Sequence, residues 1–147
     1  MTEEHRRRII VAARGWLGTP YVHQASCKGA GCDCLGLIRG VWRDVIGSEP
    51  ESPPPYKPDW AERAGEETML AAAMRHLVKK PDDAPIEPGD VLLFRYRCGL
   101  PAKHAGIATG KDAMIHAQEN VGVVQVPLCG WWHRHLAATF TFPEDDI

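Results

Sequence analysis

The sequence predicts an α+β fold, with helices in the first half of the chain and an antiparallel sheet in the second half. Two patterns predict it. Apolar residues recur at helical spacing up to about residue 78, and from residue 88 onward short apolar runs alternate with turn residues. The length of 147 residues and the hydrophobic content of 44% fit one domain of ordinary size, spanning residues 1–147.

Three helices are expected, at residues 3–17, 33–46 and 60–78. Asp33 is a suitable N-cap for the second helix. Gly36 and Gly40 lie four residues apart inside that helix, where each costs up to about 1 kcal/mol relative to alanine. We expect close backbone packing on this face to offset the cost, which would make the second helix central and buried.

The remaining segments are predicted as loops and short strands. Residues 21–32 form a loop, and the proline-rich stretch 48–59 forms an extended surface connection. Packing at a sheet edge is favoured for Trp131–His135, although this aromatic and basic run could also dock sugar, peptide or a partner protein. Strands are expected at residues 91–94, 104–109, 113–117, 121–126 and 137–142.

Charge and hydropathy exclude several classes of function. The net charge is -2 and the pI is about 6.4, so we expect no nucleic-acid partner. No run approaches the roughly 18 apolar residues of a membrane span, and we expect no stable membrane insertion. The first residues also lack the roughly 7–15 residue apolar core of a signal peptide, so any export would need another route.

The cysteines are five in number, and an odd count without a signal peptide does not indicate a disulfide framework. A metal site could be sought in Cys27, Cys32 and Cys34 with His23, but their spacing matches no common zinc pattern. We therefore expect neither a metal nor another cofactor. The sequence assigns no role to the four other cysteines: Cys27, Cys32, Cys98 and Cys129.

Cys34 is the candidate nucleophile. A thiol attacks a carbonyl only as a thiolate, and a free cysteine has a pKa near 8.5. The predicted position of Cys34 in the first turn of the second helix would lower this pKa through the positive end of the helix. The free N–H groups of the same turn could stabilise the oxyanion of a tetrahedral intermediate. The simpler alternative is a small buried cysteine with no chemical role.

His104 and His116 are the candidate imidazoles, one on each strand of a predicted hairpin around Gly110. If the loop has an odd number of residues, the two histidines project from the same face of the hairpin. They lie directly opposite each other if the loop is centred on Gly110, and they are diagonal neighbours if it is centred one residue away. A two-residue loop would send them to opposite faces. On one face, His116 could orient His104 toward Cys34, or the two could form a metal pair.

Four motifs in this order resemble the NlpC/P60 family of cell-wall peptidases. The first two are Gly18-Thr19-Pro20-Tyr21 and Asp33-Cys34-Leu35-Gly36-Leu37, similar to the segment preceding the family's nucleophile and to its Asp-Cys-Ser-Gly-Leu pattern. The others are Pro88-Gly89-Asp90-Val91 and His104-Ala105-Gly106-Ile107, followed by the strand that contains His116. Together they cover most of the chain.

The resemblance implies a papain-like fold, with N-terminal helices and the nucleophile helix packed on the antiparallel sheet. It implies Cys34 as nucleophile, His104 as base and His116 as the orienting residue. Tyr21 matches a family tyrosine that can contact substrate or assist the oxyanion. Asp33 would either cap its helix or meet a substrate amine. Leu35 departs from the family pattern, which has serine there.

The same resemblance implies an activity and a setting. The activity is hydrolysis of amide bonds in peptidoglycan stem or cross-bridge peptides. The string from His23 to Gly40, with Trp131-Trp132, resembles a compact subgroup associated with phage tails and gene transfer agents. This implies a protein made in the bacterial cytoplasm, located at a virion tail tip beside tail hub proteins, and acting at the cell wall. The alternatives are a structural tail component with weak or assembly-dependent activity, and a thiol acyltransferase.

Overall fold

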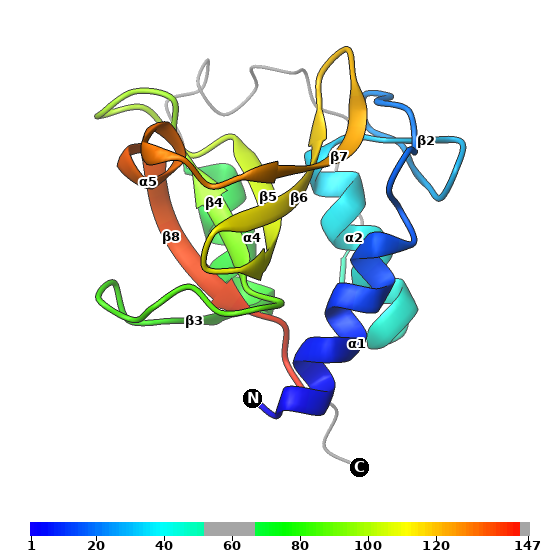
Figure 1. Cartoon of the computed structure of the whole chain (residues 1–147), viewed down its shortest axis with the longest axis horizontal. Coiled ribbons are helices and arrows are strands. Elements are labelled where there is room, and N and C mark those ends of the chain that lie inside the picture. The colour runs from blue at the N-terminus through cyan, green and yellow to red at the C-terminus, as the bar shows by residue number, and fades with distance from the viewer. Residues whose placement is uncertain (52–66, 145–147) are drawn as a thin grey trace.

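The computed structural model describes residues 1–51 and 67–144, which form an α+β arrangement of helices beside one antiparallel sheet (Figure 1). The six strands follow the order β3-β8-β4-β5-β6-β7. Their bounds are β3 Val78–Lys79, β4 Val91–Phe94, β5 His104–Gly110, β6 Ala113–Gln118, β7 Gly122–Pro127 and β8 Leu136–Thr141. The predicted fold class and antiparallel sheet are confirmed.

The helices in the described ranges are α1 Glu3–Arg14, α2 Cys34–Val45, α4 Thr68–His76 and α5 Gly130–His135. Figure 1 shows α1 and α2 running side by side next to the sheet. The glycines of α2 explain this close approach. A Cβ atom at Gly40 would overlap the ring of Trp16, and one at Gly36 would overlap the carbonyl of Ala25. The predicted close packing around the glycine-containing face is confirmed.

The two faces of the sheet bury different sets of apolar residues. Odd-numbered residues of the central strands join the core formed with α1 and α2: Val91, Leu93, Ala105, Ile107 and Ile115. Even-numbered residues form a second, smaller cluster on the other face: Leu92, Phe94, Ala108 and Met114. This alternation follows from the period of two in a strand, and it places His104 and His116 on the second face.

Several expected boundaries differ from the structure. The first helix ends at Arg14 rather than residue 17, because the next N–H groups, of Trp16 and Leu17, bond to carbonyls three residues earlier and the chain turns. The helix predicted over residues 60–78 is seen as α4, Thr68–His76, since the chain leaves it to pair β3 with β8, and residues 60–66 lie outside the described ranges.

Two further segments have structure that the sequence did not predict. The expected loop over residues 21–32 contains a small antiparallel pair, β1 Ser26–Cys27 and β2 Gly31–Cys32. The segment Trp131–His135 belongs to α5 and is not an edge strand. Its helical form lets Trp132 pack against Phe94 on the second face of the sheet, which explains why the edge-strand prediction is wrong.

No helix within residues 1–51 and 67–144 is long and apolar enough to cross a membrane.

Candidate active site

The N-terminus of α2 places the candidate nucleophile. Asp33 is the N-cap, and its carboxylate accepts hydrogen bonds from the backbone N–H of Gly36 at 2.7 Å and of Gln24 at 2.8 Å. This buried carboxylate therefore fixes both the start of the helix and the preceding loop. Cys34 follows as the first residue of α2 and is half-buried.

The sulfur of Cys34 reaches the beginning of β5. Its thiol donates a long hydrogen bond to the Lys103 carbonyl oxygen at 3.9 Å, and the backbone N–H groups of Ala105 and Leu35 interact with the sulfur. The helix end and the strand that contains His104 therefore meet at this atom, although they are separated by about 70 residues in sequence.

The β5–β6 hairpin puts both imidazoles on one face. Ile107 pairs with Ile115 and Ala108 with Met114, so His104 and His116 are diagonal neighbours. The connecting loop has only two residues, Lys111 and Asp112, but an irregularity at Thr109 shifts the register and restores the shared face. Of the predicted alternatives, the diagonal arrangement is correct.

The two imidazoles are joined by a hydrogen bond. His104 Nε2 lies 2.7 Å from His116 Nδ1, and both rings are buried. If His104 donates from Nε2, its Nδ1 holds a lone pair and can accept a proton. His116 then bears its own proton on Nε2, a buried atom without a hydrogen-bond partner among the residues the structure describes. The contact lets His116 hold the His104 ring in place, and the roles of base and orienting residue stay predictions.

One pocket contains the predicted residues Tyr21, Cys34, His104 and His116 in its lining. Tyr21 enters it from the segment before β1, where a backbone bridge to Cys32 holds the tyrosine. Asp33 is not among the lining residues; its carboxylate is turned to the backbone N–H groups that it caps. The structure thus brings four of the five predicted site residues together and gives the fifth a capping role.

The thiol is protonated in the resting protein. Burial and the neighbouring Asp33 carboxylate raise the pKa of Cys34 to about 12, although the backbone N–H groups of Ala105 and Leu35 act in the opposite direction. This corrects the prediction that the helix end lowers the pKa. The helix end does favour the thiolate, but desolvation and the Asp33 charge outweigh it.

The imidazoles are neutral at pH 7. Burial, with repulsion from His116 and Lys103, lowers the pKa of His104 to about 3, and burial lowers that of His116 to about 4. Burial also raises the pKa of Tyr21 above its usual range, so its hydroxyl remains a hydrogen-bond donor. The site thus presents a neutral thiol, a neutral base and a neutral donor.

Comparison with known proteins shows the family and the fold of this chain. A model of the NlpC/P60 family matches residues 18–139, a range that includes Tyr21, Cys34, His104 and His116. The chain belongs to the NlpC/P60 family. Among solved structures, the NlpC/p60 domain of peptidoglycan hydrolase SagA superposes with a TM-score of 0.64 at 22% identity, covering 93% of this chain and 98% of that domain. An NlpC/P60 family protein from Bacillus cereus superposes with a TM-score of 0.66 at 19% identity, covering 93% of this chain and 40% of that protein.

Two sequence relatives extend this family relationship. The chain is 30% identical over 114 residues to a gamma-DL-glutamyl hydrolase of Bacillus subtilis, covering 76% of this chain and 23% of the relative. It is 26% identical over 120 residues to murein DD-endopeptidase MepS/murein LD-carboxypeptidase of Escherichia coli, covering 81% of this chain and 53% of the relative. The chain thus spans about half of one relative and less than a quarter of the other.

Sequence reasoning missed the aromatic surroundings of the imidazoles in this NlpC/P60 chain. Tyr96, Trp131 and Trp132 also line the pocket. Only the Trp131-Trp132 pair gave a signal in the sequence, and its placement depends on the helical form of α5.

Within the described ranges, no three histidine, cysteine or acidic side chains are grouped to hold a metal ion. His104 Nε2 and His116 Nδ1 face each other, so the pair does not present these two nitrogens to an ion.

Proposed function

We propose that this protein is a cysteine peptidase that hydrolyses amide bonds in peptidoglycan stem or cross-bridge peptides. The observation that carries the proposal is the common pocket of Cys34 and the hydrogen-bonded imidazoles His104 and His116. A nucleophile, a base and an orienting group in one cleft form the usual constellation for covalent acyl transfer. Membership of the NlpC/P60 family supports the same chemistry.

The first half of the reaction forms an acyl-enzyme. His104 Nδ1 takes the proton of the Cys34 thiol while the sulfur attacks the amide carbonyl carbon. A resting thiol with a raised pKa requires this transfer to accompany the attack, so His104 acts as a general base rather than as one member of a standing ion pair. The carbonyl oxygen becomes an oxyanion, and the α2 N-terminus and the Tyr21 hydroxyl stabilise it.

The second half releases the products. The tetrahedral intermediate collapses, the C–N bond breaks, and the leaving amine takes the proton from His104. A water molecule then attacks the thioester carbonyl and gives a proton to His104. The C–S bond breaks, the carboxylic acid leaves, and the thiol of Cys34 regains its proton. His116 accepts from His104 Nε2 throughout and stabilises the imidazolium that forms in each half.

The substrate class is supported by the names of the relatives. One relative is a murein endopeptidase and another is a gamma-DL-glutamyl hydrolase. Both names describe cleavage of amide bonds, and murein is peptidoglycan. We infer a stem or cross-bridge peptide as the substrate of this chain. Asp33 would meet a substrate amine only through the part of its carboxylate not used in capping, and that role stays a prediction.

Digestion of purified sacculi tests the proposal. The wild-type protein is expected to release peptide fragments that mass spectrometry assigns to one type of amide bond. Cys34→Ala should release none, and Cys27→Ala, which removes an exposed thiol elsewhere, should match the wild type. Absence of fragments from the wild-type digest, or equal release by Cys34→Ala, would remove the hydrolase assignment.

We further propose delivery by a phage or gene transfer agent tail, with tail hub or tail-tip proteins as partners. The support is the resemblance of the string from His23 to Gly40, together with Trp131-Trp132, to the compact tail-associated subgroup. The protein is then made in the bacterial cytoplasm and reaches the wall on the particle. Mass spectrometry of purified tailed particles from the source bacterium is expected to detect this chain. Its absence from intact particles, with detection in the cell lysate, would contradict the proposal.

A further inference from the structure

Trp132 of α5 lies against both imidazoles of the site. Its ring centroid is 5.7 Å from that of His104, with an interplanar angle of 27°, and 5.3 Å from that of His116, with an angle of 81°. Phe94 holds the indole from the sheet, at 4.8 Å in an edge-on arrangement. The indole therefore stacks on the proposed base, meets its orienting residue edge-on, and is itself anchored in the second apolar cluster.

We propose that Trp132 is a positioning residue that fixes the His104–His116 hydrogen bond and keeps water away from it. This rests on the proposed role of His104 as general base. The structural reason is that the hydrogen bond between the imidazoles joins one atom of each ring, His104 Nε2 and His116 Nδ1, at 2.7 Å. Rotation of either ring would break that contact, and a stacked indole opposes the rotation sterically.

The packing around His104 leaves Trp132 as the contact shared by both rings. Tyr96 also stacks near His104, at 6.2 Å and 30°, and Phe94 lies 6.3 Å from it. Trp132 differs from these two because it also contacts His116. Trp131, the neighbouring indole, makes its ring contacts with Tyr96, Trp132 and His135, and so provides a matched control.

Burial by Trp132 has an electrostatic consequence that can be measured. Burial is the first cause of the lowered pKa of both histidines. The titratable or charged described groups that contact His104 or share its pocket include His116 of β6, Lys103 before β5, Cys34 of α2, Tyr96 after β4, Tyr21 before β1 and Glu119 after β6. Trp132 has no charge, so its removal admits water without altering any of these groups. The pKa of both imidazoles should then rise toward the ordinary value near 6.5.

Histidine NMR titration of Trp132→Ala in the full chain tests the proposal. We expect the pKa of His104 and of His116 to rise by at least about one unit. Trp132→Phe should restore most of the wild-type values, and Trp131→Ala should shift them less than Trp132→Ala does. His104→Gln and His116→Gln assign the signals. A folded Trp132→Ala protein with both pKa values unchanged would overturn the proposal. If Trp132→Ala does not fold, Trp132→Leu replaces it and is judged by the same criterion.

Kinetics on sacculi provide the second readout. Trp132→Ala is expected to lower kcat at least tenfold with KM within about twofold, and to move the acid limb of kcat/KM to higher pH. A purely structural indole would lower stability without moving that limb. The titration needs no substrate, so it judges the role of Trp132 even if the wild type cleaves nothing. An inactive wild type would instead contradict the proposed function.

Discussion

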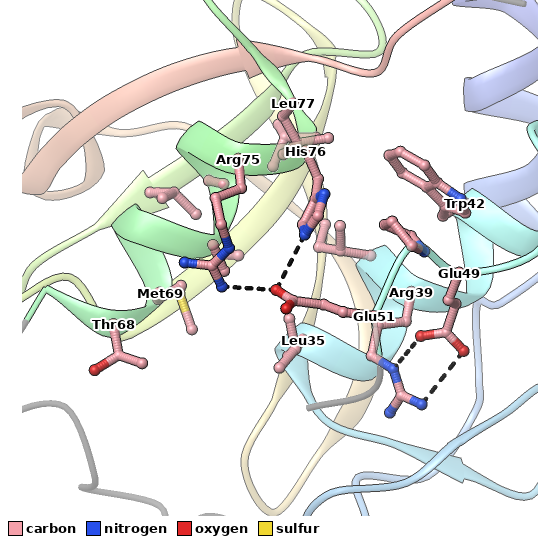
Figure 2. Close-up of a pocket in the computed structure, with 17 residues that line it drawn as sticks. Leu35, Arg39, Trp42, Glu49, Glu51, Thr68, Met69, Arg75, His76 and Leu77 are labelled. Atoms are coloured by element: carbon pink, nitrogen blue, oxygen red, sulfur yellow. Dashed lines mark hydrogen bonds and ion pairs between the residues drawn. The ribbon is translucent and has the colours of Figure 1, made fainter. Parts of the chain in front are cut away.

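Two pockets lie on either side of the same short segments of backbone, and they differ in how their polar groups are paired. Cys34 and His104 face the catalytic pocket, while the next residues, Leu35 and Ala105, line a second pocket between α2 and α4 (Figure 2). The floor of the second pocket is apolar: Leu35, Ile38, Met69, Ala72, Ala73, Val91, Leu93 and Ala105.

The charged groups of the second pocket are compensated. Figure 2 shows Glu51 between α2 and α4, where it meets Arg75 at 2.7 Å and His76 at 3.0 Å. Arg39 is paired with Glu49 in the same way. Two buried Nε2 atoms without a hydrogen-bond partner within the ranges described belong to His76 and His116. That of His76, in the second pocket, still lies 3.0 Å from the Glu51 carboxylate, whereas that of His116, in the proposed catalytic pocket, has no ion-pair partner among the described residues.

This difference indicates that the residues proposed for catalysis lie in one pocket, and that apolar and ion-paired residues line the other. A helix turns by about 100° per residue and a strand alternates its side chains, so adjacent residues enter different environments. One environment holds the proposed nucleophile and base, and the other holds apolar and ion-paired side chains. Variants on the two sides should therefore have opposite effects on catalysis and on stability.

The largest predicted effect is the difference in kcat/KM between variants of the neighbouring residues Cys34 and Leu35. Cys34→Ala removes the proposed nucleophile, and kcat/KM on sacculi should fall by at least about 10⁴-fold. Leu35→Ser restores the family pattern in the adjacent pocket, and its kcat/KM should stay within about tenfold of the wild type. Fragment release followed by mass spectrometry measures both. A loss in Leu35→Ser as large as that in Cys34→Ala would show that the two pockets are not functionally separate.

The next prediction ranks the two histidines. His104→Ala removes the general base and should lower kcat by about 10³- to 10⁴-fold. His116→Ala leaves the base in place but unoriented, with a loss of about 10²-fold, and His116→Asn should recover part of it because the amide oxygen can accept from His104. Greater activity in His104→Ala than in His116→Ala would reverse the assigned roles.

A third prediction concerns stability and pH. With the pKa of His104 at about 3 and that of His116 at about 4, neither ring of the folded protein takes up a second proton between about pH 6.5 and 5. The unfolded chain does bind them below about 6.5, so the free energy of unfolding falls as pH decreases through that window. From pH 7 to 5 each histidine should contribute a loss of about 2 kcal/mol.

Urea unfolding at pH 7, 6 and 5 measures this dependence. The double variant His104→Gln/His116→Gln lacks both groups, so its free energy of unfolding should fall less over this range than that of the wild type. Equal losses in the two proteins would mean that neither imidazole is held neutral by the fold. The catalytic pocket would then lose the feature that distinguishes it from the ion-paired pocket.

The sequence predicted those parts of the structure that depend on local signals. Asp33 as a cap and the glycine-lined face of α2 follow from the immediate neighbourhood of each residue, and both are confirmed. The residues of the pocket were identified through the order of four motifs. The hairpin register stayed open because it depends on one irregular residue, Thr109, which periodicity alone cannot locate.

Properties that depend on distant packing could not be predicted in this way. The pKa of Cys34 is raised because its burial and the Asp33 charge outweigh the helix end, and burial is set by the approach of β5. The packing of α5 on the sheet joins Trp132 to Phe94, a residue more than thirty positions earlier. For the same reason, the contacts of Trp132 with the imidazoles could not be predicted from the sequence.

The smallest predicted effects belong to the second pocket. Met69 is buried on its floor, and Met69→Ala should lower the free energy of unfolding by about 2 kcal/mol, near the low end for such truncations because the pocket already leaves one side unfilled. Arg75→Ala breaks an exposed ion pair with Glu51 and should cost less than about 1 kcal/mol. Both variants should keep kcat within about twofold of the wild type at 25 °C. A tenfold fall in kcat in folded Met69→Ala would show that this pocket controls the position of Cys34, so that its apolar packing forms part of the catalytic apparatus.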